Sequence, residues 1–378
     1  MSAGVLSGTR VVVANNFPGS GMGGGEVQQL PVAKAFAEAG AEVVGVVAPG
    51  SGFGTALRAA GIDVVETRMS LRSVRAAVRA IRAQIAEKPT VLVGTGYFTN
   101  ILVRLAGHST TARVVNVVGV VPGSSLVDSG SRAGATIRTV ADRLTAARVD
   151  AWIAVSAAVA DALVAGGAPA SRVHVVPNGI DLDALHAAAQ VPLGRAVPEG
   201  RPLVACVARL EPVKGVEYLV RAVPLVPGAT FAILGEGSAE GYLRELSVAL
   251  SVSNRVVFLG GHESAASLLA ASDVVVVPSL SEGFGLVAAE AMALARPVVA
   301  TRVGGLPEVV ADQVSGIIVA PADPPALAAA IRRLVAEPEV ARAMGEAGAV
   351  YAGERYTAQR MTGAYVQLVA ALIASPPR

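Results

Sequence analysis

The sequence contains a single cysteine, Cys206, which lies within a short apolar stretch. One cysteine excludes a disulfide within the chain and a metal centre built from thiolates. The absence of disulfides is typical of a reducing compartment, so we expect a cytoplasmic protein. The first residues, Met1–Arg10, lack the long apolar core of a secretory signal, and this supports the same expectation.

Long hydrophobic runs are also missing, although 53% of the residues are hydrophobic. No run reaches the ~18 apolar residues that a membrane-spanning helix needs, so we expect no stable membrane insertion. The apolar residues instead form short valine-rich runs and alanine-rich stretches broken by charges. This pattern indicates buried strands that alternate with helices.

Lysine is scarce, and the overall charge is close to balanced. Only Lys34, Lys88 and Lys214 occur, so arginine carries almost all of the positive charge. The formal net charge of +2 gives no reason to expect a nucleic-acid partner. Because Arg and Lys are not interchangeable at tight phosphate sites, a lysine retained in such a chain is a candidate ligand.

A chain of 378 residues favours two domains. We expect a first domain at 1–186, a linker rich in Pro, Gly and Ala at 187–201, a second domain at 202–355 and a terminal helix within 356–378. Both domains alternate predicted strands and helices, which indicates an α/β fold with parallel sheets. The strands are expected at Thr9–Asn15, Glu42–Ala48, Thr90–Gly94, Arg113–Val118, Ala151–Val155, Val173–Val176, Pro202–Ala208, Ala229–Leu234, Arg255–Leu259, Asp273–Val277, Pro297–Ala300 and Gly316–Val319.

Two carboxylates follow the strand that begins at Asp273. Glu282 lies in a glycine-containing loop, and Glu290 lies inside the helix predicted at Leu286–Leu294. Taken alone, either glutamate is more simply interpreted as a helix cap or a solvated helical residue.

The same loop offers backbone donors. The amides of Phe284, Gly285 and Leu286 should point outward at the helix N-terminus, which favours an anion. A carboxylate beside free amides suits a ligand with both hydroxyls and negative groups, such as a sugar nucleotide.

The complete string reads EGFGLVAAEAMA, then RPVVAT, then GGLPE. It resembles the Glu-x7-Glu signature of retaining glycosyltransferases of the family-4 type, and the resemblance is strongest from Pro202 to Val319. It implies a GT-B fold, with two Rossmann-like doubly wound domains facing a central cleft and a last helix that crosses back to the first domain. It also implies that Glu282 contacts the donor sugar and that Glu290 binds ribose hydroxyls.

Two cations follow the first strand of the second domain. Arg209 and Lys214 precede a loop–helix junction, where Arg can act as a fork and Lys as a point charge on a pyrophosphate. The alternative is a pair of solvated surface charges. The segment resembles the family's Arg-Leu-x-x-x-Lys-Gly motif, which implies a phosphate role. We therefore assign catalytic roles to Arg209, Lys214 and Glu282.

Further donor contacts are implied by the same resemblance. Gly235 and Gly237 match a Gly-Glu-Gly turn near the nucleotide, and His262 lies where the family lines the base pocket. The other histidines, His108, His174 and His186, are interpreted as structural. The loop with Gly23, Gly24 and Gly25 resembles the family's GG-x-E loop, near the donor phosphates and the acceptor, although a dinucleotide-binding fold also has a glycine-rich turn.

The acceptor side departs from the family. Many relatives carry a His-Gly pair after the strand equivalent to Arg113–Val118, whereas Val118-Gly119 occupies that place here. Asn116 should point to the same face as Val118. Either Asn116 supplies a polar contact there, or the backbone of the loop Gly119–Ser125 does, or activity is lost.

We expect no essential metal and no cofactor beyond the nucleotide-sugar co-substrate. Asp181 and Asp183 form an Asp-x-Asp pair, but no third hard ligand is near them in the sequence, and the family is generally metal-independent.

The sequence therefore predicts a retaining hexosyltransferase that uses a nucleotide sugar, preferably a UDP-sugar. Its acceptor is expected to be a small hydroxylated molecule, such as an aminocyclitol of antibiotic biosynthesis. The alternatives are a GT-B epimerase acting on UDP-N-acetylglucosamine and a non-catalytic homologue that binds a sugar nucleotide or a protein. A lipid acceptor is disfavoured by the lack of a basic amphipathic helix near the N-terminus. The Arg-rich helix expected at Leu71–Ala86 points the other way.

Overall fold

The computed structural model describes residues 4–17, 24–119, 145–194, 202–261 and 264–375. The chain divides into two compact units, which are Met1–Gly179 with Ala358–Arg378, and Ile180–Thr357. The sequence predicted the end of the first domain at residue 186, but the division falls earlier, after Gly179. The reason is helix α7 (Leu182–Ala189), which takes in the start of the expected linker and packs in the second unit. There the Ser267 hydroxyl donates to the carbonyl of Ala188 at 3.0 Å.

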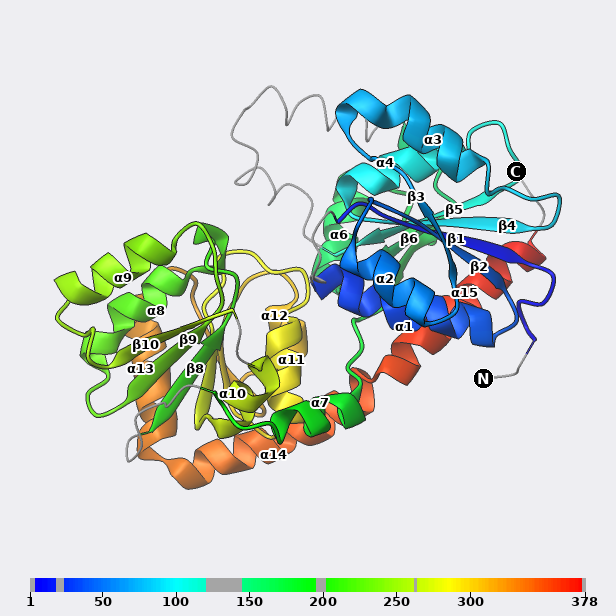
Figure 1. Cartoon of the computed structure of the whole chain (residues 1–378). Coiled ribbons are helices and arrows are strands. Elements are labelled where there is room, and N and C mark those ends of the chain that lie inside the picture. The colour runs from blue at the N-terminus through cyan, green and yellow to red at the C-terminus, as the bar shows by residue number, and fades with distance from the viewer. Residues whose placement is uncertain (1–3, 18–23, 120–144, 195–201, 262–263, 376–378) are drawn as a thin grey trace. The chain divides into compact units, whose positions relative to one another are not determined.

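The first unit is built on a parallel seven-stranded sheet with the order β3-β2-β1-β4-β5-β6-β7 (Figure 1). The strands are β1 (Arg10–Asn15), β2 (Glu42–Val47), β3 (Asp63–Glu66), β4 (Thr90–Thr95), β5 (Arg113–Val118), β6 (Ala151–Ala154) and β7 (Val173–Val175). Its helices are α1 (Gly24–Glu38), α2 (Gly52–Ala59), α3 (Val74–Arg82), α4 (Tyr97–Ala106), α6 (Ala157–Ala165) and α15 (Ala358–Ala374).

Helices cover both faces of this sheet because side chains alternate along each strand. In β1, Val11 and Val13 pack with α1, α2 and α15, whereas Val12 and Ala14 pack with α3 and α4 (Figure 1). Tyr365 of α15 meets Phe36 of α1 edge-on, with ring centroids 6.5 Å apart. The last helix therefore completes the core of the first unit.

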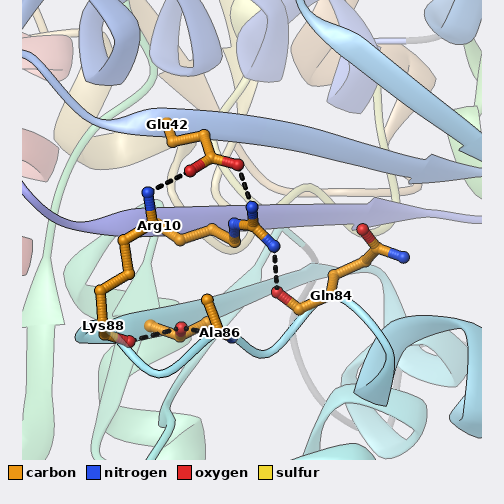
Figure 2. A network of polar contacts seen from close by, with 6 residues as sticks. Arg10, Glu42, Gln84, Ala86 and Lys88 are labelled. Atoms are coloured by element: carbon orange, nitrogen blue, oxygen red, sulfur yellow. Dashed lines mark hydrogen bonds and ion pairs between the residues drawn. The ribbon is translucent and has the colours of Figure 1, made fainter.

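A polar network joins the amino ends of three strands of this sheet (Figure 2). The Glu42 carboxylate pairs with the guanidinium of Arg10 and with the ammonium of Lys88. Arg10 also donates to the carbonyl of Gln84 at 3.2 Å. The hydrogen bonds from Lys88 and Arg10 lower the pKa of Glu42. One of the three lysines thus stabilises the fold, at the end of the strands opposite to the loops where ligands bind in such sheets.

The second unit is built on a parallel six-stranded sheet with the order β10-β9-β8-β11-β12-β13. The strands are β8 (Leu203–Val207), β9 (Thr230–Leu234), β10 (Val256–Gly260), β11 (Val274–Val277), β12 (Val298–Thr301) and β13 (Gly316–Val319). The chain order runs outward in one direction from β8 and in the other from β11. The β8–β11 neighbourhood is therefore the topological switch point, where open α/β sheets bind ligands.

Helices α7, α8 (Val216–Ala222), α9 (Glu240–Ala249), α10 (Ala265–Ala271), α11 (Leu286–Ala293), α12 (Leu306–Val309), α13 (Pro324–Ala336) and α14 (Pro338–Arg355) complete the second unit. The main core lies where α8, α9, α13 and α14 pack on the sheet. Both sheets confirm the predicted class of two Rossmann-like, doubly wound domains.

Two helices differ from the sequence prediction. The polar segment GTGYFTN at residues 94–100 predicts a loop before a helix at Ile101–Ala106. Helix α4 instead begins at Tyr97, because Asn100 is buried and its amide donates to the carbonyl of Val117 at 3.0 Å. The expected helix Leu71–Ala86 is a 3₁₀ turn at Leu71–Ser73 followed by α3, which ends at Arg82. Local polarity favoured a loop at the start of α4, but burial outweighs it. Of the loop Gly119–Ser125, every residue after Gly119 lies outside the described residues.

Candidate functional site

The predicted donor motifs meet at the switch point of the second unit. Arg209 and Lys214 follow β8, whereas Glu282 and helix α11 follow β11, which pairs with β8 in parallel. The carboxyl ends of both strands lie at the same edge of the sheet. The fold therefore brings residues 68 positions apart into contact.

The central contact is an ion pair between Lys214 and Glu282. The Lys214 Nζ lies 2.7 Å from the Glu282 Oε2, and both side chains are about one-fifth exposed. The Ser279 hydroxyl also donates to this carboxylate at 3.2 Å, and the Thr301 hydroxyl donates to the Ser279 carbonyl at 2.6 Å. The sequence analysis missed Ser279 and Thr301. The Ser-x-x-Glu spacing in a loop was the available signal for Ser279.

Glycines let the loops pack tightly enough to form this pair. A Cβ on Gly215, whose φ is +63°, would lie 2.1 Å from the carbonyl oxygen of Pro278. A Cβ on Gly304 would lie 1.7 Å from the carbonyl oxygen of Glu282. The loop after β11 is therefore clamped between the loops that follow β8 and β12, and Glu282 is held from its backbone as well as from its side chain.

Gly235 and Gly237 have a packing explanation of their own. Their Cβ atoms would lie 1.8 Å from the Ala208 carbonyl oxygen and 2.4 Å from that of Leu210. Both glycines thus serve the contact between the loops after β9 and β8, and their contact with a nucleotide stays a prediction. His262 lies outside the described residues.

The loop that carries Arg209 is braced by a residue that sequence reasoning missed. The Glu211 carboxylate accepts hydrogen bonds from the Ser238 hydroxyl at 2.5 Å and the Ser238 amide at 3.1 Å. These bonds lower the pKa of Glu211. The Arg209 side chain is exposed and forms no hydrogen bond or ion pair within the described residues, so it is available to an anion.

The N-terminus of α11 supplies backbone donors, as predicted. Gly285 precedes the helix with a φ of +99°. Within the part of the chain that the structure describes, the amides of Phe284, Gly285 and Leu286 donate to no partner. The Phe284 ring is buried and meets Tyr356 edge-on, with centroids 5.2 Å apart. Phe284 therefore offers its backbone, not its side chain, to a ligand.

Glu290 is not a solvated helical residue. Its side chain is half-buried, and desolvation raises the pKa of the carboxyl group to about 7. Among the described residues it has no hydrogen-bond partner. Partial burial without a partner makes this carboxylate costly to ionise, and hydroxyl groups of a ligand would lower that cost.

Cys206 is not a candidate nucleophile. It is fully buried on β8, and burial raises the pKa of its thiol to about 12. Asp181, from the Asp-x-Asp pair, accepts the amide of Ala184 and caps helix α7. Within the described ranges, no three His, Cys, Asp or Glu side chains are grouped so that they could hold a metal ion, and independence from metal stays a prediction.

The first unit places Asn116 in its interior. In the amide orientation that satisfies its neighbours, the Asn116 oxygen accepts two hydrogen bonds from Arg104, at 2.5 and 2.6 Å. Arg104 is also buried, donates to the Thr145 hydroxyl at 3.1 Å and lies 4.5 Å from the centre of the Trp152 ring. Asn116 thus holds an arginine that sequence reasoning missed. The sequence feature that could have indicated a buried Arg104 is its place as the single charged residue in the apolar run ILVRLA.

The glycine loop after β1 lies at the switch point of the first sheet. Gly24 begins helix α1, and a Cβ on Gly25 would meet no atom of the described residues within 4 Å. Packing therefore does not explain the glycine at 25, which is consistent with the predicted approach of a ligand. Gly23 lies outside the described residues. Asn15 donates to the buried Glu26 carboxylate at 2.8 Å and ties the strand to this helix.

No helix among the described residues is both long and apolar enough to cross a membrane.

Two units, each an open parallel sheet covered by helices, define the GT-B class of folds. Residues 22–184 match the family model described as Glycosyltransferase Family 4, and residues 194–350 match Glycosyl transferases group 1. Together the two models span both units, so the chain belongs to the family-4 type of glycosyltransferases. This confirms the resemblance stated from the EGFGLVAAEAMA string.

Curated relatives match part of the chain. It is 42% identical over 196 residues to a D-inositol 3-phosphate glycosyltransferase of Segniliparus rotundus, and 39% identical over 202 residues to one of Mycobacteroides abscessus. These alignments cover 48% and 50% of this chain, and 43% and 45% of the relatives. The match thus spans less than half the length of these proteins.

Solved structures share the fold over nearly the whole chain. The Anabaena protein Alr3699/HepE, in complex with UDP and glucose, has a TM-score of 0.81 at 20% identity and covers 96% of this chain and 99% of its own. A sucrose-phosphate synthase from Thermosynechococcus elongatus has a TM-score of 0.79 at 22% identity, with 96% and 100% covered.

Proposed function

We propose that this chain is a retaining glycosyltransferase that moves a hexosyl group from a UDP-sugar to a hydroxyl group of a small cyclitol or cyclitol phosphate. The observation that carries the proposal is the Lys214–Glu282 pair at the switch point, on the same sheet edge as amides with no partner among the described residues and the half-buried carboxyl of Glu290. A cation, free N–H donors and two carboxylates at one sheet edge match a ligand made of a diphosphate and two hydroxylated rings.

Each group has a separate part in donor binding. Arg209, Lys214 and the amides before α11 bind the diphosphate, because they are the positive and donor groups of the site. Glu290 accepts hydrogen bonds from ribose hydroxyls, and Glu282 accepts them from the transferred sugar. The ion pair with Glu282 then holds the Lys214 ammonium where the sugar meets the phosphate.

The transfer takes place on one face of the sugar. The acceptor oxygen forms a bond to the anomeric carbon as the bond from that carbon to the diphosphate oxygen breaks. The proton of the acceptor hydroxyl passes to an oxygen of the departing diphosphate. Lys214 and Arg209 stabilise the negative charge that grows on this leaving group, an effect that is larger in the transition state than in the ground state. The anomeric configuration is kept without a covalent enzyme intermediate.

The choice of substrates is supported by similarity alone. UDP is bound in the Anabaena Alr3699/HepE structure, and the curated relatives are named for D-inositol 3-phosphate. These names support a cyclitol acceptor and a uridine donor for this chain. They favour a cyclitol phosphate over the aminocyclitol expected at first.

A second function, donor binding without transfer, is favoured by one observation. Val118 stands where many relatives have a histidine, and Asn116, the polar candidate beside it, is buried against Arg104. If transfer needs a polar side chain at this position, neither residue offers one.

The experiment is a screen of sugar nucleotides for binding by native mass spectrometry, followed by turnover assays with inositols and inositol phosphates. Product stereochemistry by NMR tests the mechanism, and we expect the donor's configuration to be kept. An inverted product would refute the mechanism. Bound donor without turnover across the panel would favour the non-catalytic function, and donor consumed without any acceptor would favour an epimerase.

A further inference from the structure

One segment of the first unit, residues 67–86, carries several exposed arginines. Arg68, Arg72, Arg75 and Arg79 are all exposed, on the turn before α3 and on α3 itself. Residues 67–86 contain no Asp or Glu. Positions three and four apart lie on one side of a helix, so Arg75 and Arg79 project together and Arg72 continues their line.

These arginines have no partner among the described residues. No hydrogen bond or ion pair involves the side chains of Arg68, Arg72, Arg75 or Arg79. Exposed arginines on other helices do pair, for example Arg244 with Glu240 at 2.8 Å. The charge on this surface is therefore not neutralised by neighbours, in a chain whose formal net charge is only +2.

The surface also exposes one large apolar side chain. Leu71 is 86% exposed, the highest value among the large exposed hydrophobic residues of the described chain. It begins the 3₁₀ turn, where the Ser73 hydroxyl accepts the amide of Ser70 at 2.9 Å and donates to the carbonyl of Arg68 at 2.7 Å. The turn is thus braced by local hydrogen bonds while its leucine projects beside Arg72.

The opposite side of α3 anchors the helix to its unit. Ala77 and Ile81 are fully buried against α4 and the sheet (Figure 1). At the end of α3 the Arg82 guanidinium donates to the carbonyls of Leu105 and Ala106, at 2.9 and 3.1 Å. The arginine surface is therefore part of the folded unit and needs no rearrangement to bind a partner.

We propose that this surface, Arg68, Leu71, Arg72, Arg75 and Arg79, binds an anionic lipid bilayer. Arginines near an anionic leaflet attract the headgroups, and their aliphatic stems reach apolar depth. A leucine set among them favours a bilayer over nucleic acid, because a phosphate backbone offers no apolar layer to bury it. The partner is the lipid surface itself, and the proposal does not depend on the proposed transfer reaction.

The test is flotation of the whole protein with phosphatidylcholine vesicles, with and without phosphatidylglycerol, at low and high salt. We expect binding to the phosphatidylglycerol vesicles alone, weakened by salt because surface charges are screened. Each arginine near the surface is worth about fivefold in partition. Arg72→Gln/Arg75→Gln/Arg79→Gln should therefore lower partition by about 100-fold, and Leu71→Ser by severalfold.

A matched variant separates this surface from net charge. Arg332→Gln/Arg333→Gln/Arg342→Gln removes the same charge from exposed positions of the second unit, and it should bind vesicles like the unchanged protein. Circular dichroism and thermal unfolding check that both triple variants are folded. Equal loss in the two variants, no preference for phosphatidylglycerol, or tighter binding to a double-stranded oligonucleotide than to vesicles would each overturn the proposal.

Discussion

Glu290 should couple donor binding to pH. Its carboxyl group is half-buried and without a partner in the described structure, and its pKa is raised from 4.5 to about 7 by desolvation. On the proposed function, the ionised form accepts hydrogen bonds from the ribose hydroxyls. Binding therefore favours ionisation, lowers the pKa of Glu290 in the complex and releases a proton near neutral pH.

The size of this pH dependence follows from the pKa of Glu290. The ionised fraction of Glu290 falls from about one half at pH 7 to about one tenth at pH 6, so UDP affinity should fall about fivefold between these two pH values. Above about pH 8 the affinity should be constant, because the free protein is then already ionised. Calorimetry in two buffers of different ionisation enthalpy should show nearly one proton released at about pH 6 and almost none at about pH 8.5.

Glu290→Gln is the control, because the terminal phosphate of UDP itself titrates with a pKa of about 6. That contribution is common to both proteins and cancels in the comparison. The variant should bind UDP more weakly at pH 8 and show only the ligand's own pH dependence. If the unchanged protein and Glu290→Gln share the same pH profile, Glu290 does not bind the ribose.

Stability offers a test of Glu290 without any ligand. A carboxyl whose folded pKa lies above its unfolded value destabilises the fold once it must ionise. The free energy of unfolding should therefore fall between pH 4.5 and pH 7 by up to about 3 kcal/mol. Glu290→Gln should remove this loss, so it should be the more stable protein at pH 8 and lose that advantage near pH 4.5. A variant that is less stable at pH 8 would contradict the burial argument.

Three further outcomes follow from the other charged groups. Lys214→Ala should lower kcat by ~100-fold or more, which is the scale of a lost electrostatic donor. The control is Lys34→Ala, at an exposed lysine, which should leave kcat unchanged. An unchanged kcat in folded Lys214→Ala would sink the assignment. Glu282→Gln should weaken binding of the sugar nucleotide but leave UDP affinity nearly unchanged, so an equal loss of both in calorimetry would show that the division of roles is wrong. Glu42→Gln should lower the free energy of unfolding by less than ~1 kcal/mol at neutral pH. This difference should disappear in acid, because the pKa of Glu42 is lowered and its stabilisation is lost once the carboxylate is protonated; a difference that persists in acid would point to packing instead.

Local pattern was sufficient to predict the position of the donor motifs and the strands of both sheets, except the short edge strand β3. A run such as Val274–Val277 is buried on both faces of a parallel sheet, so its composition alone indicates a strand. Arg209, Lys214 and Glu282 were singled out because their segments resemble the Arg-Leu-x-x-x-Lys-Gly and Glu-x7-Glu motifs of the family. Gly215 and Gly304 support them, because each needs the space that only glycine leaves.

Tertiary structure decided how these residues interact. The Lys214–Glu282 contact depends on β8 lying beside β11, a neighbourhood formed by long-range pairing and not visible in either segment. The raised pKa of Glu290 depends on the residues that bury α11, and its helical position alone suggested a solvated side chain. Asn116 was expected at an acceptor site because strand periodicity places it on the same face of the sheet as Val118. Periodicity does not show which side chains cover that face. Here the buried Arg104 covers it, from a helix that begins earlier than its polar sequence indicated.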